Sequence, residues 1–398
     1  MRVRYDARVA SPTHATQSTC IRPDYPMDHE NELLTRVSRF VQIEVAPRFN
    51  NGETVTLDAG LAAAAAAAGL FGFQVPPAFG GAGASFAVKA RIAEILAGAD
   101  FGLAMSLINT QNVANHLARS ADAAVAQRHV PDLVAGRKSG CTALTEPGAG
   151  SDFAAIQTTA TQVGGNWRLD GAKAWIINAL HAEVLLVYAQ TRPGSGAAGI
   201  AAFVVDADRA GFARGPAMTG AMPAMGTGSF RLEGYVATAD EMLFAPGQAF
   251  KRALTSINGA RIYVAAMCCG MVDAALSVAA DYGRRRSTFG QVLFEHQGWR
   301  WSLADASVDL EAARLLVADA AGRLDAGTDV QGAAARAKVF ATRMAHRHLG
   351  ALLHATGAEG LRDCHPFLRH LEAAQAAAFT DGSTEMLLER VARELRNP

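Results

Sequence analysis

One aspartate near the end of the chain stands where a carboxylate could move a proton. Asp381 lies in the polar stretch TDGSTEMLLER, residues 380–390, beside a glycine and just before an apolar helical pattern. A buried carboxylate can take a weakly acidic proton, because burial raises its pKa and its basicity. Aspartate is also a good helix cap. Two roles are therefore open for Asp381, a general base and a cap of the helix that begins near Ser383.

A glycine-rich segment and a tryptophan could together bind a planar heterocycle. The segment TALTEPGAGSD, residues 142–152, can present backbone N–H groups to a polar ring edge or a phosphate. The tryptophan of KAWIINA, residues 173–179, can stack on a flat ring. Each motif alone is weak, since turn glycines and core tryptophans are common, but their spacing strengthens the interpretation.

Several other chemistries have no motif in this chain. It contains no G-x-G-x-x-G after a strand, no G-x-x-x-x-G-K-[ST] and no G-x-S-x-G. His346 and His348 stand two residues apart on a predicted helix, which turns them to different faces. We therefore expect neither a metal site nor a dinucleotide-fold, P-loop or hydrolase enzyme.

Composition indicates a small-molecule partner. The 398 residues carry 37 basic and 37 acidic side chains, so no charge excess favours nucleic acid or an anionic membrane. The five cysteines are odd in number and lack metal-like spacing, which indicates reduced thiols in the cytoplasm. Residues 1–26 have no apolar stretch, so they are expected to be a flexible extension and neither a signal peptide nor a membrane span. Met27 could be the true start.

Three successive textures predict the elements that position these residues. Residues 27–139 read as helices, with a first helix from Asp28 to a proline stop at Pro47, a second over 57–72, and three more over 86–99, 101–119 and 121–135. Residues 140–246 show short β-branched segments, with a hairpin turn at 164–166. Residues 247–398 show long apolar repeats typical of a four-helix bundle.

Taken together, the motifs resemble those of the FAD-dependent acyl-CoA dehydrogenase family. The match includes LTEPGAGSD and K-x-W-I-x-N, as well as GLFGFQVPPAFGG (69–81), RRSTFG (285–290) and HATGAEG (354–360), and it spans roughly residues 28–396. The resemblance implies a mainly α fold with an N-terminal helical domain, a middle β-barrel or sandwich domain and a C-terminal four-helix bundle. It also implies FAD held between domains and across a subunit boundary, hence a homodimer or homotetramer.

The resemblance assigns roles to individual positions. Arg286, Phe289 and Gln297 match residues that reach a neighbouring subunit's FAD, where the guanidinium fork suits a diphosphate. The full set of cofactor positions is Leu144, Thr145, Gly150, Ser151, Trp175, Ile177, Arg286, Phe289, Gln297, His354, Gly357, Ser383 and Glu385. The substrate positions are Ser151, Arg261, Thr380 and Gly382.

Asp381 falls where most family members carry the glutamate that removes the substrate's α-proton. It is one methylene shorter, and a displacement of ~1 Å can cost about a hundredfold in rate. Some relatives place the base on the long helix of the third domain, but that position is Ala260 here. The base role therefore returns to Asp381, with the cap-only role as its alternative.

Other positions depart from the family pattern and leave the reaction open. Ile177 replaces a hydroxyl residue, His354 replaces a glutamine, and Thr380 replaces an aromatic residue. The first hypothesis is an acyl-thioester dehydrogenase, using coenzyme A or a carrier protein and passing electrons to an electron-transfer flavoprotein. The second is a flavin oxidase or monooxygenase, similar to the nitroalkane oxidase branch. The third is a binding or assembly protein without turnover.

Overall fold

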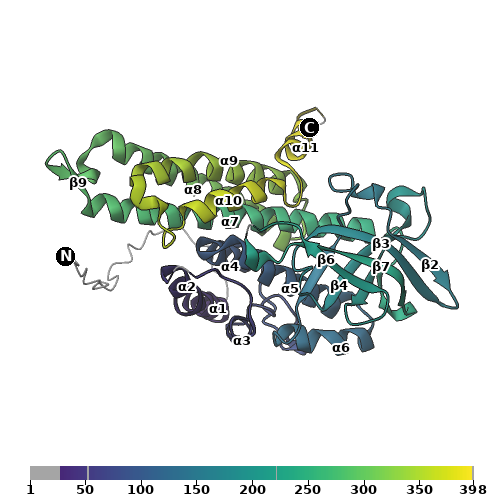
Figure 1. The fold of residues 1–398 in the computed structure, drawn as a ribbon. Helices are drawn as coiled ribbons and strands as arrows, with labels where there is room; N and C mark the ends of the chain where they lie inside the picture. Colours follow the sequence, from purple (N-terminus) through teal and green to yellow (C-terminus); the bar gives the residue numbers. More distant parts are fainter. Residues whose placement is uncertain (1–26, 52, 221, 397–398) are drawn as a thin grey trace.

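The computed structural model describes residues 27–51, 53–220 and 222–396, so the predicted extension 1–26 lies outside the described residues. Helices fill both ends of the described sequence, and one mixed sheet lies between them. In Figure 1 the sheet occupies one end of an elongated helical body, and the N-terminal helices lie beneath that body. The order is helices, strands, helices, as the sequence predicts.

Among the residues that the structure describes, the N-terminal part contains six α-helices, and the predicted end of the first helix is wrong. The helical path does not end at Pro47. A π-helical turn over Val41–Val45 leads into a further short helix, and this proline lies at the start of that helix. Proline is tolerated there, since the first helical N–H groups have no intrahelical acceptor. The helices are α1 Met27–Phe40, α2 Ala46–Asn50, α3 Ala59–Ala67, α4 Phe86–Ala99, α5 Phe101–Ser120 and α6 Ala123–Val134.

The middle part is a sheet of eight strands in which β1 pairs with β4 and the others run in the order β6-β7-β3-β2-β4-β5-β8. The predicted hairpin is confirmed, because Gly164 and Gly165 both have positive φ between β2 and β3. The strands are β1 Gly140–Ala143, β2 Thr159–Val163, β3 Asn166–Ile176, β4 Val184–Gln190, β5 Ile200–Asp206, β6 Phe212–Ala217, β7 Gly228–Ala237 and β8 Met242–Phe244.

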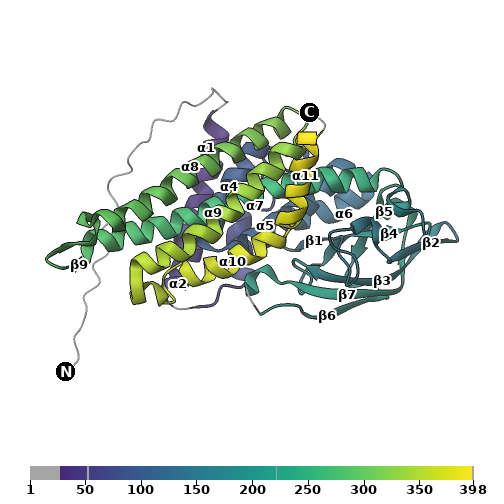
Figure 2. The same cartoon turned by 90° about the horizontal axis from the view of Figure 1, so that it is seen from above.

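The C-terminal part is the predicted bundle of long helices. Its axis is α7, which packs against α4, α8 and α9 (Figure 2). A two-stranded ribbon, β9 Ser287–Thr288 and β10 Gln291–Val292, closes the end of the bundle that lies farthest from the sheet (Figure 1). The helices are α7 Ala249–Arg285, α8 Gln297–Asp325, α9 Gln331–Thr356, α10 Phe367–Phe379 and α11 Thr384–Arg396.

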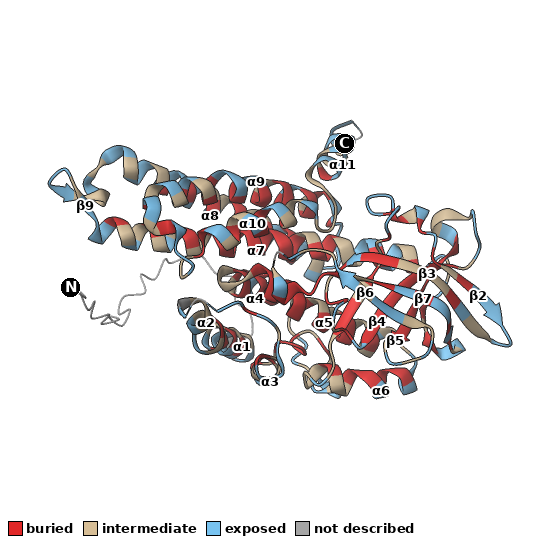
Figure 3. Ribbon diagram, in the orientation of Figure 1, coloured by how far each residue is buried: buried red, intermediate tan, exposed pale blue. Residues whose placement is uncertain are grey.

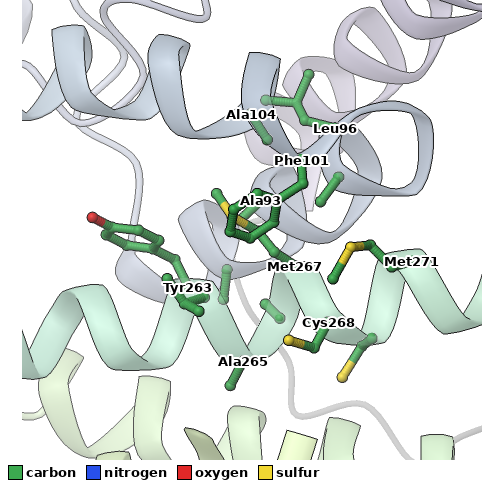
Figure 4. Close-up of a cluster of buried hydrophobic side chains, with 14 of the residues drawn as sticks. Ala93, Leu96, Phe101, Ala104, Tyr263, Ala265, Met267, Cys268 and Met271 are labelled. Carbon is green, nitrogen blue, oxygen red and sulfur yellow. The ribbon is translucent and has the colours of Figure 1, made fainter. Parts of the chain in front are cut away.

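Helix α7 is the centre of the core. By length and composition it could cross a membrane, but 72% of its most apolar window is buried inside the protein, as in a core helix. Figure 3 shows it buried along most of its length. Its Met267 and Met271 lie on the side that faces Leu96 and Phe101, whereas Cys268 points to the opposite side of the helix (Figure 4). The cysteines within the described residues are free thiols.

Candidate active site

Trp175 is turned outward by an irregularity in β3. The pairing of β3 with β7 shifts register between Lys173 and Ile176, and Trp175 takes a left-handed backbone with φ 60°. Such a bulge re-aims a side chain, and here it leaves the indole 56% exposed between the buried Ala174 and Ile176. The Trp175 ring is therefore presented to a ligand instead of filling the core.

A buried ion pair holds the glycine-rich loop beside Trp175. Lys173 Nζ donates to Glu146 Oε1 at 2.8 Å and to the carbonyl oxygen of Leu144 at 3.0 Å. Glu146 also accepts from the amide nitrogens of Gln157 and Thr158 at 2.6 and 3.0 Å. Burial lowers the pKa of Lys173 to about 8, while Glu146 keeps a lowered pKa because the lysine charge and these donors outweigh its own burial. The loop is fixed through charges that neutralise each other.

The far side of the tryptophan is anchored to helix α5. Asn178 has φ 65°, a conformation that asparagine tolerates better than most residues. Its Nδ2 donates to the carbonyl oxygens of Ser106 and Gly140, both at 2.9 Å. The K-x-W-I-x-N motif thus combines a loop-holding lysine, an outward ring and an anchor.

The loop that carries Asp381 is clamped by two cations from other helices. Arg261 Nε, on α7, donates to the backbone oxygen of Asp381 at 3.0 Å. Lys338 Nζ, on α9, donates to the backbone oxygen of Gly382 at 2.6 Å and to that of Thr380. Asp381 has φ 57°, a left-handed backbone that is strained for a residue other than glycine and that these contacts stabilise, and Gly382 follows with φ 108°. Arg261 also donates from Nη1 to Asn258 Oδ1 at 2.8 Å, so neither cation is hydrogen-bonded to the Asp381 carboxylate within the described residues.

The electrostatics of this loop suit a base. Burial raises the pKa of Asp381, while Lys338 and Arg261 work in the opposite direction. Burial likewise lowers the pKa of Lys338 to about 8, against the attraction of Asp381. No hydrogen bond to the Asp381 carboxylate is formed within the described residues. Its oxygens are therefore available to a substrate.

The cap of α11 belongs to Ser383. Its Oγ accepts from the amide nitrogen of Met386 at 3.4 Å, at the first turn of the helix. Glu385 is exposed in the same turn, and hydrogen bonds lower its pKa. The hydroxyl of Thr380 donates back to the carbonyl oxygen of Ala376 at the end of α10. The geometry gives no capping contact to Asp381, which favours the base role over the cap-only alternative.

Helix α5 connects the two loops. Asn109 Oδ1 accepts from the amide nitrogen of Thr142 at 3.2 Å, just before the glycine-rich loop. One turn later on the same face, Asn112 is hydrogen-bonded to the hydroxyl of Tyr263, and the charge of Asp381 raises the pKa of that hydroxyl after the larger effect of burial. Residues on one face of α5 thus reach the start of the glycine-rich loop through Thr142 and the surroundings of Asp381 through Tyr263.

The remaining cofactor positions lie at the other end of the bundle. Arg286, Phe289 and Gln297 flank the β9–β10 ribbon, and His354 and Gly357 end α9. These two groups meet there, because Trp299 Nε1 in α8 donates to the carbonyl oxygen at position 355 at 2.9 Å. Figure 1 shows this ribbon far from the sheet. Within one chain, these five residues do not share a site with Trp175.

The residues near Trp175 fit a flat cofactor such as FAD. A Cβ added to Gly148 would meet no atom within 4 Å, and one at Gly150 would meet only a Thr145 methyl at 3.8 Å. The space over this loop is therefore open, and the Thr145 methyl group borders it. Ile177 is half-buried and packs at the edge of the core, so it brings no hydroxyl to the site.

Three family models match consecutive parts of the chain. They describe the acyl-CoA dehydrogenase N-terminal domain over residues 27–137, the middle domain over 141–234 and the C-terminal domain over 247–396. The rat protein "Short/branched chain specific acyl-CoA dehydrogenase, mitochondrial" is 30% identical, over 94% of this chain and 88% of its own length. The chain belongs to the acyl-CoA dehydrogenase family. This membership confirms the predicted fold, FAD as the cofactor, and a flavin-dependent oxidoreductase acting on CH–CH groups.

Solved structures agree with this membership. Butyryl-CoA dehydrogenase from Megasphaera elsdenii has a TM-score of 0.88 and 29% identity, covering 94% of this chain and 100% of that one. A structure described as the electron transferring flavoprotein of Acidaminococcus fermentans contains a chain with a TM-score of 0.89 and 26% identity. That likeness covers 95% of this chain and 100% of that one.

Sequence reasoning missed the residues that hold the site. Lys338 received no role, although a lysine within the apolar pattern of α9 is a usable signal. Glu146 and Lys173 were recognised only as members of two motifs and were assigned no role of their own.

The separate cavity of about 650 Å³ between α5, α10 and the turn at Pro223 is lined by neither Asp381 nor Trp175.

Proposed function

We propose that this protein oxidises an acyl thioester to its 2,3-unsaturated product with Asp381 as the base. The thioester is carried by coenzyme A or by a carrier protein, and the enzyme acts in the cytoplasm. The family is FAD-dependent and acts on CoA thioesters; the identity of the base and of the substrate is the proposal. The observation that carries it is the clamped backbone of Asp381, with its carboxylate left without a protein partner.

The residues have distinct tasks in this scheme. Asp381 takes the α-proton, and its burial gives the carboxylate the basicity that this weak acid requires. FAD, when bound, supplies the acceptor for the hydride that leaves the β-carbon. Lys338 and Arg261 keep the carboxylate in place, and covering the site excludes water from the proton transfer.

Cofactor binding in this proposal uses two copies of the chain. Leu144, Thr145 and Trp175 hold the ring system in one subunit, and Arg286 and Phe289 serve the FAD of a second copy. Phe289 supports this arrangement, because it is 95% exposed with φ 48° and its only ring contact within the described chain is an edge contact with His296 at 6.4 Å. A homodimer or homotetramer follows.

Electrons leave, in this proposal, through an electron-transfer flavoprotein or a similar acceptor. The support is the likeness to a chain in the structure described as such a flavoprotein. Family membership also relates the protein to acyl-CoA substrates.

The test is an anaerobic titration of the FAD-loaded protein with acyl-CoA thioesters, followed by flavin absorbance. We expect the wild type to bleach and Asp381→Asn to stay yellow with FAD bound. Asp208→Asn, an exposed aspartate, is the control and should bleach normally. Peroxide formed during turnover in air would replace this proposal with the oxidase alternative. A colourless protein that refuses added FAD would favour the binding-protein alternative.

A further inference from the structure

Lys89 is a buried cation with only neutral partners. Its Nζ donates to Gln74 Oε1 at 2.9 Å and to Asn112 Oδ1 at 2.5 Å, and it lies 5.3 Å from the ring centres of Phe86 and Tyr263. The side chain is 4% exposed and pairs with no carboxylate of the described chain. Burial lowers the pKa of Lys89 to about 7, and no acid offsets that effect.

The other buried lysines show how unusual this is. Lys173 has a carboxylate at 2.8 Å, and Lys338 has the charge of Asp381 close by. A buried charge without a counterion is costly and is usually neutralised or paired. Lys89 therefore has neither a carboxylate partner, as Lys173 has, nor a carboxylate charge close by, as Lys338 has.

The groups around Lys89 add no negative charge. His116 forms a hydrogen bond with Ser256 at 3.1 Å, and burial together with the charges of Lys89 and Arg252 lowers its pKa to about 4. It is neutral near pH 7. The side chains in contact with Lys89 are thus amides and aromatic rings, with a neutral imidazole nearby, a set that suits an incoming anion.

This cluster lies on the active-site side of α7. Tyr263 is close to both Lys89 and Asp381, because Lys89 lies over its ring and Asp381 acts electrostatically on its hydroxyl. Figure 4 shows the Tyr263 hydroxyl directed away from Met267, Cys268 and Met271. Asn112, which accepts from Lys89, is only half-buried. Tyr263 therefore lies beside Lys89 and within electrostatic range of Asp381.

We propose that Lys89 receives a carboxylate at the far end of the acyl group, so that the preferred substrates are ω-carboxyacyl thioesters. This inference rests on the proposed function, since it names the substrate class of the same site. The ammonium pairs with the terminal carboxylate, while Gln74 and Asn112 orient it by accepting its remaining protons. The structural alternative is that Lys89 only positions Asn112 and Tyr263.

The experiment compares chain-matched thioesters on the FAD-loaded protein. Glutaryl-CoA is paired with pentanoyl-CoA, adipoyl-CoA with hexanoyl-CoA, and suberoyl-CoA with octanoyl-CoA. Calorimetry gives the Kd, and anaerobic bleaching gives kcat/KM. We expect the wild type to favour the ω-carboxyl member of at least one pair by tenfold or more. Lys89→Met should reverse the preference while keeping or improving the uncharged member, and exposed Lys251→Met should change neither.

The outcomes separate the two proposals. A wild type that binds both members of every pair equally, or a Lys89→Met variant that loses both equally, overturns the inference and leaves the dehydrogenase intact. Tight binding of an ω-carboxyl thioester that depends on Lys89, without bleaching by any thioester, supports the inference and rejects the proposed reaction. Lys89→Gln replaces Lys89→Met if the latter does not fold, with the same expected loss of preference.

Discussion

Two buried lysines hold two loops of this protein in opposite ways. Lys173 fixes the glycine-rich loop through a carboxylate, Glu146, so that both charges are satisfied inside the protein. Lys338 fixes the Asp381 loop through backbone oxygens and leaves the neighbouring carboxylate unpaired. The glycine-rich loop has only to keep its conformation, whereas the Asp381 loop has to position a carboxylate without lowering its basicity.

The contacts of Lys338 and Arg261 show how a cation can position a base without neutralising it. A cation bonded directly to the Asp381 carboxylate would lower its pKa and its basicity. By bonding carbonyl oxygens instead, Lys338 and Arg261 stabilise the strained backbone while burial still raises the pKa of Asp381. Replacing one partner at a time tests whether the two loops are held in these different ways.

The largest effect is expected at the unpaired carboxylate itself. Asp381→Asn keeps the size of the side chain but removes the base, and we expect kcat to fall ~10³-fold or more. FAD occupancy and Tm should stay as in the wild type, because the loop is held by backbone contacts. Stopped-flow reduction by an acyl-CoA measures this. Turnover within tenfold of wild type would remove Asp381 from the mechanism.

Lys173→Met should be the most destabilising of the lysine changes. It strands Glu146 as a buried charge, which typically costs about 3–5 kcal/mol of unfolding free energy. Urea unfolding and bound FAD per subunit are the measurements, and both should fall. The double variant Lys173→Met with Glu146→Gln should recover part of the loss. A single variant as stable as wild type would contradict the idea of a self-satisfied loop.

Lys338→Met should show the reverse pattern. No carboxylate loses a direct bond, but two backbone oxygens lose their donor, so the unfolding free energy should fall by about 1–3 kcal/mol, less than in Lys173→Met. The Asp381 loop loses two hydrogen bonds, and misplacing the base should lower kcat by about 10- to 100-fold. If FAD is lost as readily as in Lys173→Met, the two loops are not held in different ways.

A smaller effect is expected when the outward ring is removed. Trp175→Ala leaves the ion pair beneath the loop intact and deletes one stacking surface, so FAD should bind about tenfold more weakly. Equilibrium dialysis against FAD measures it, with Trp301→Ala, an exposed tryptophan of α8, as the control. Unchanged affinity would show that Trp175 does not contact the cofactor.

The mildest probe is pH. Asp381 must be ionised to act, and its pKa is raised, so kcat/KM should rise with pH through a value above that of an ordinary aspartate. Lys338 loses its proton as pH passes about 8, which should weaken the clamp and lower kcat/KM a few-fold at higher pH. In Lys338→Met the alkaline decline should disappear while the acidic limb remains.

Much of this could be read from the sequence, and the exceptions have physical causes. Helix and strand textures predicted the element order, and the glycine pair at 164–165 predicted the hairpin, because these signals are local. The predicted helix end at Pro47 was wrong because a π-helical turn lets the helical path continue past this residue. A lysine inside the apolar pattern of α9 signals a buried cation, but the role of Lys338 was missed because its partners are backbone oxygens more than forty residues away. The bulge at Trp175 depends on pairing with β7, which is likewise not local.

The base assignment is tested most directly by following the proton alone. A 3-thiaacyl-CoA has sulfur in place of the β-carbon, so no hydride can leave and only the α-proton step remains. In D2O the FAD-loaded wild type should exchange the α-protons of this thioester for deuterium, seen by NMR, and Asp381→Asn should exchange them only at the buffer rate. Exchange that persists in Asp381→Asn would contradict the account.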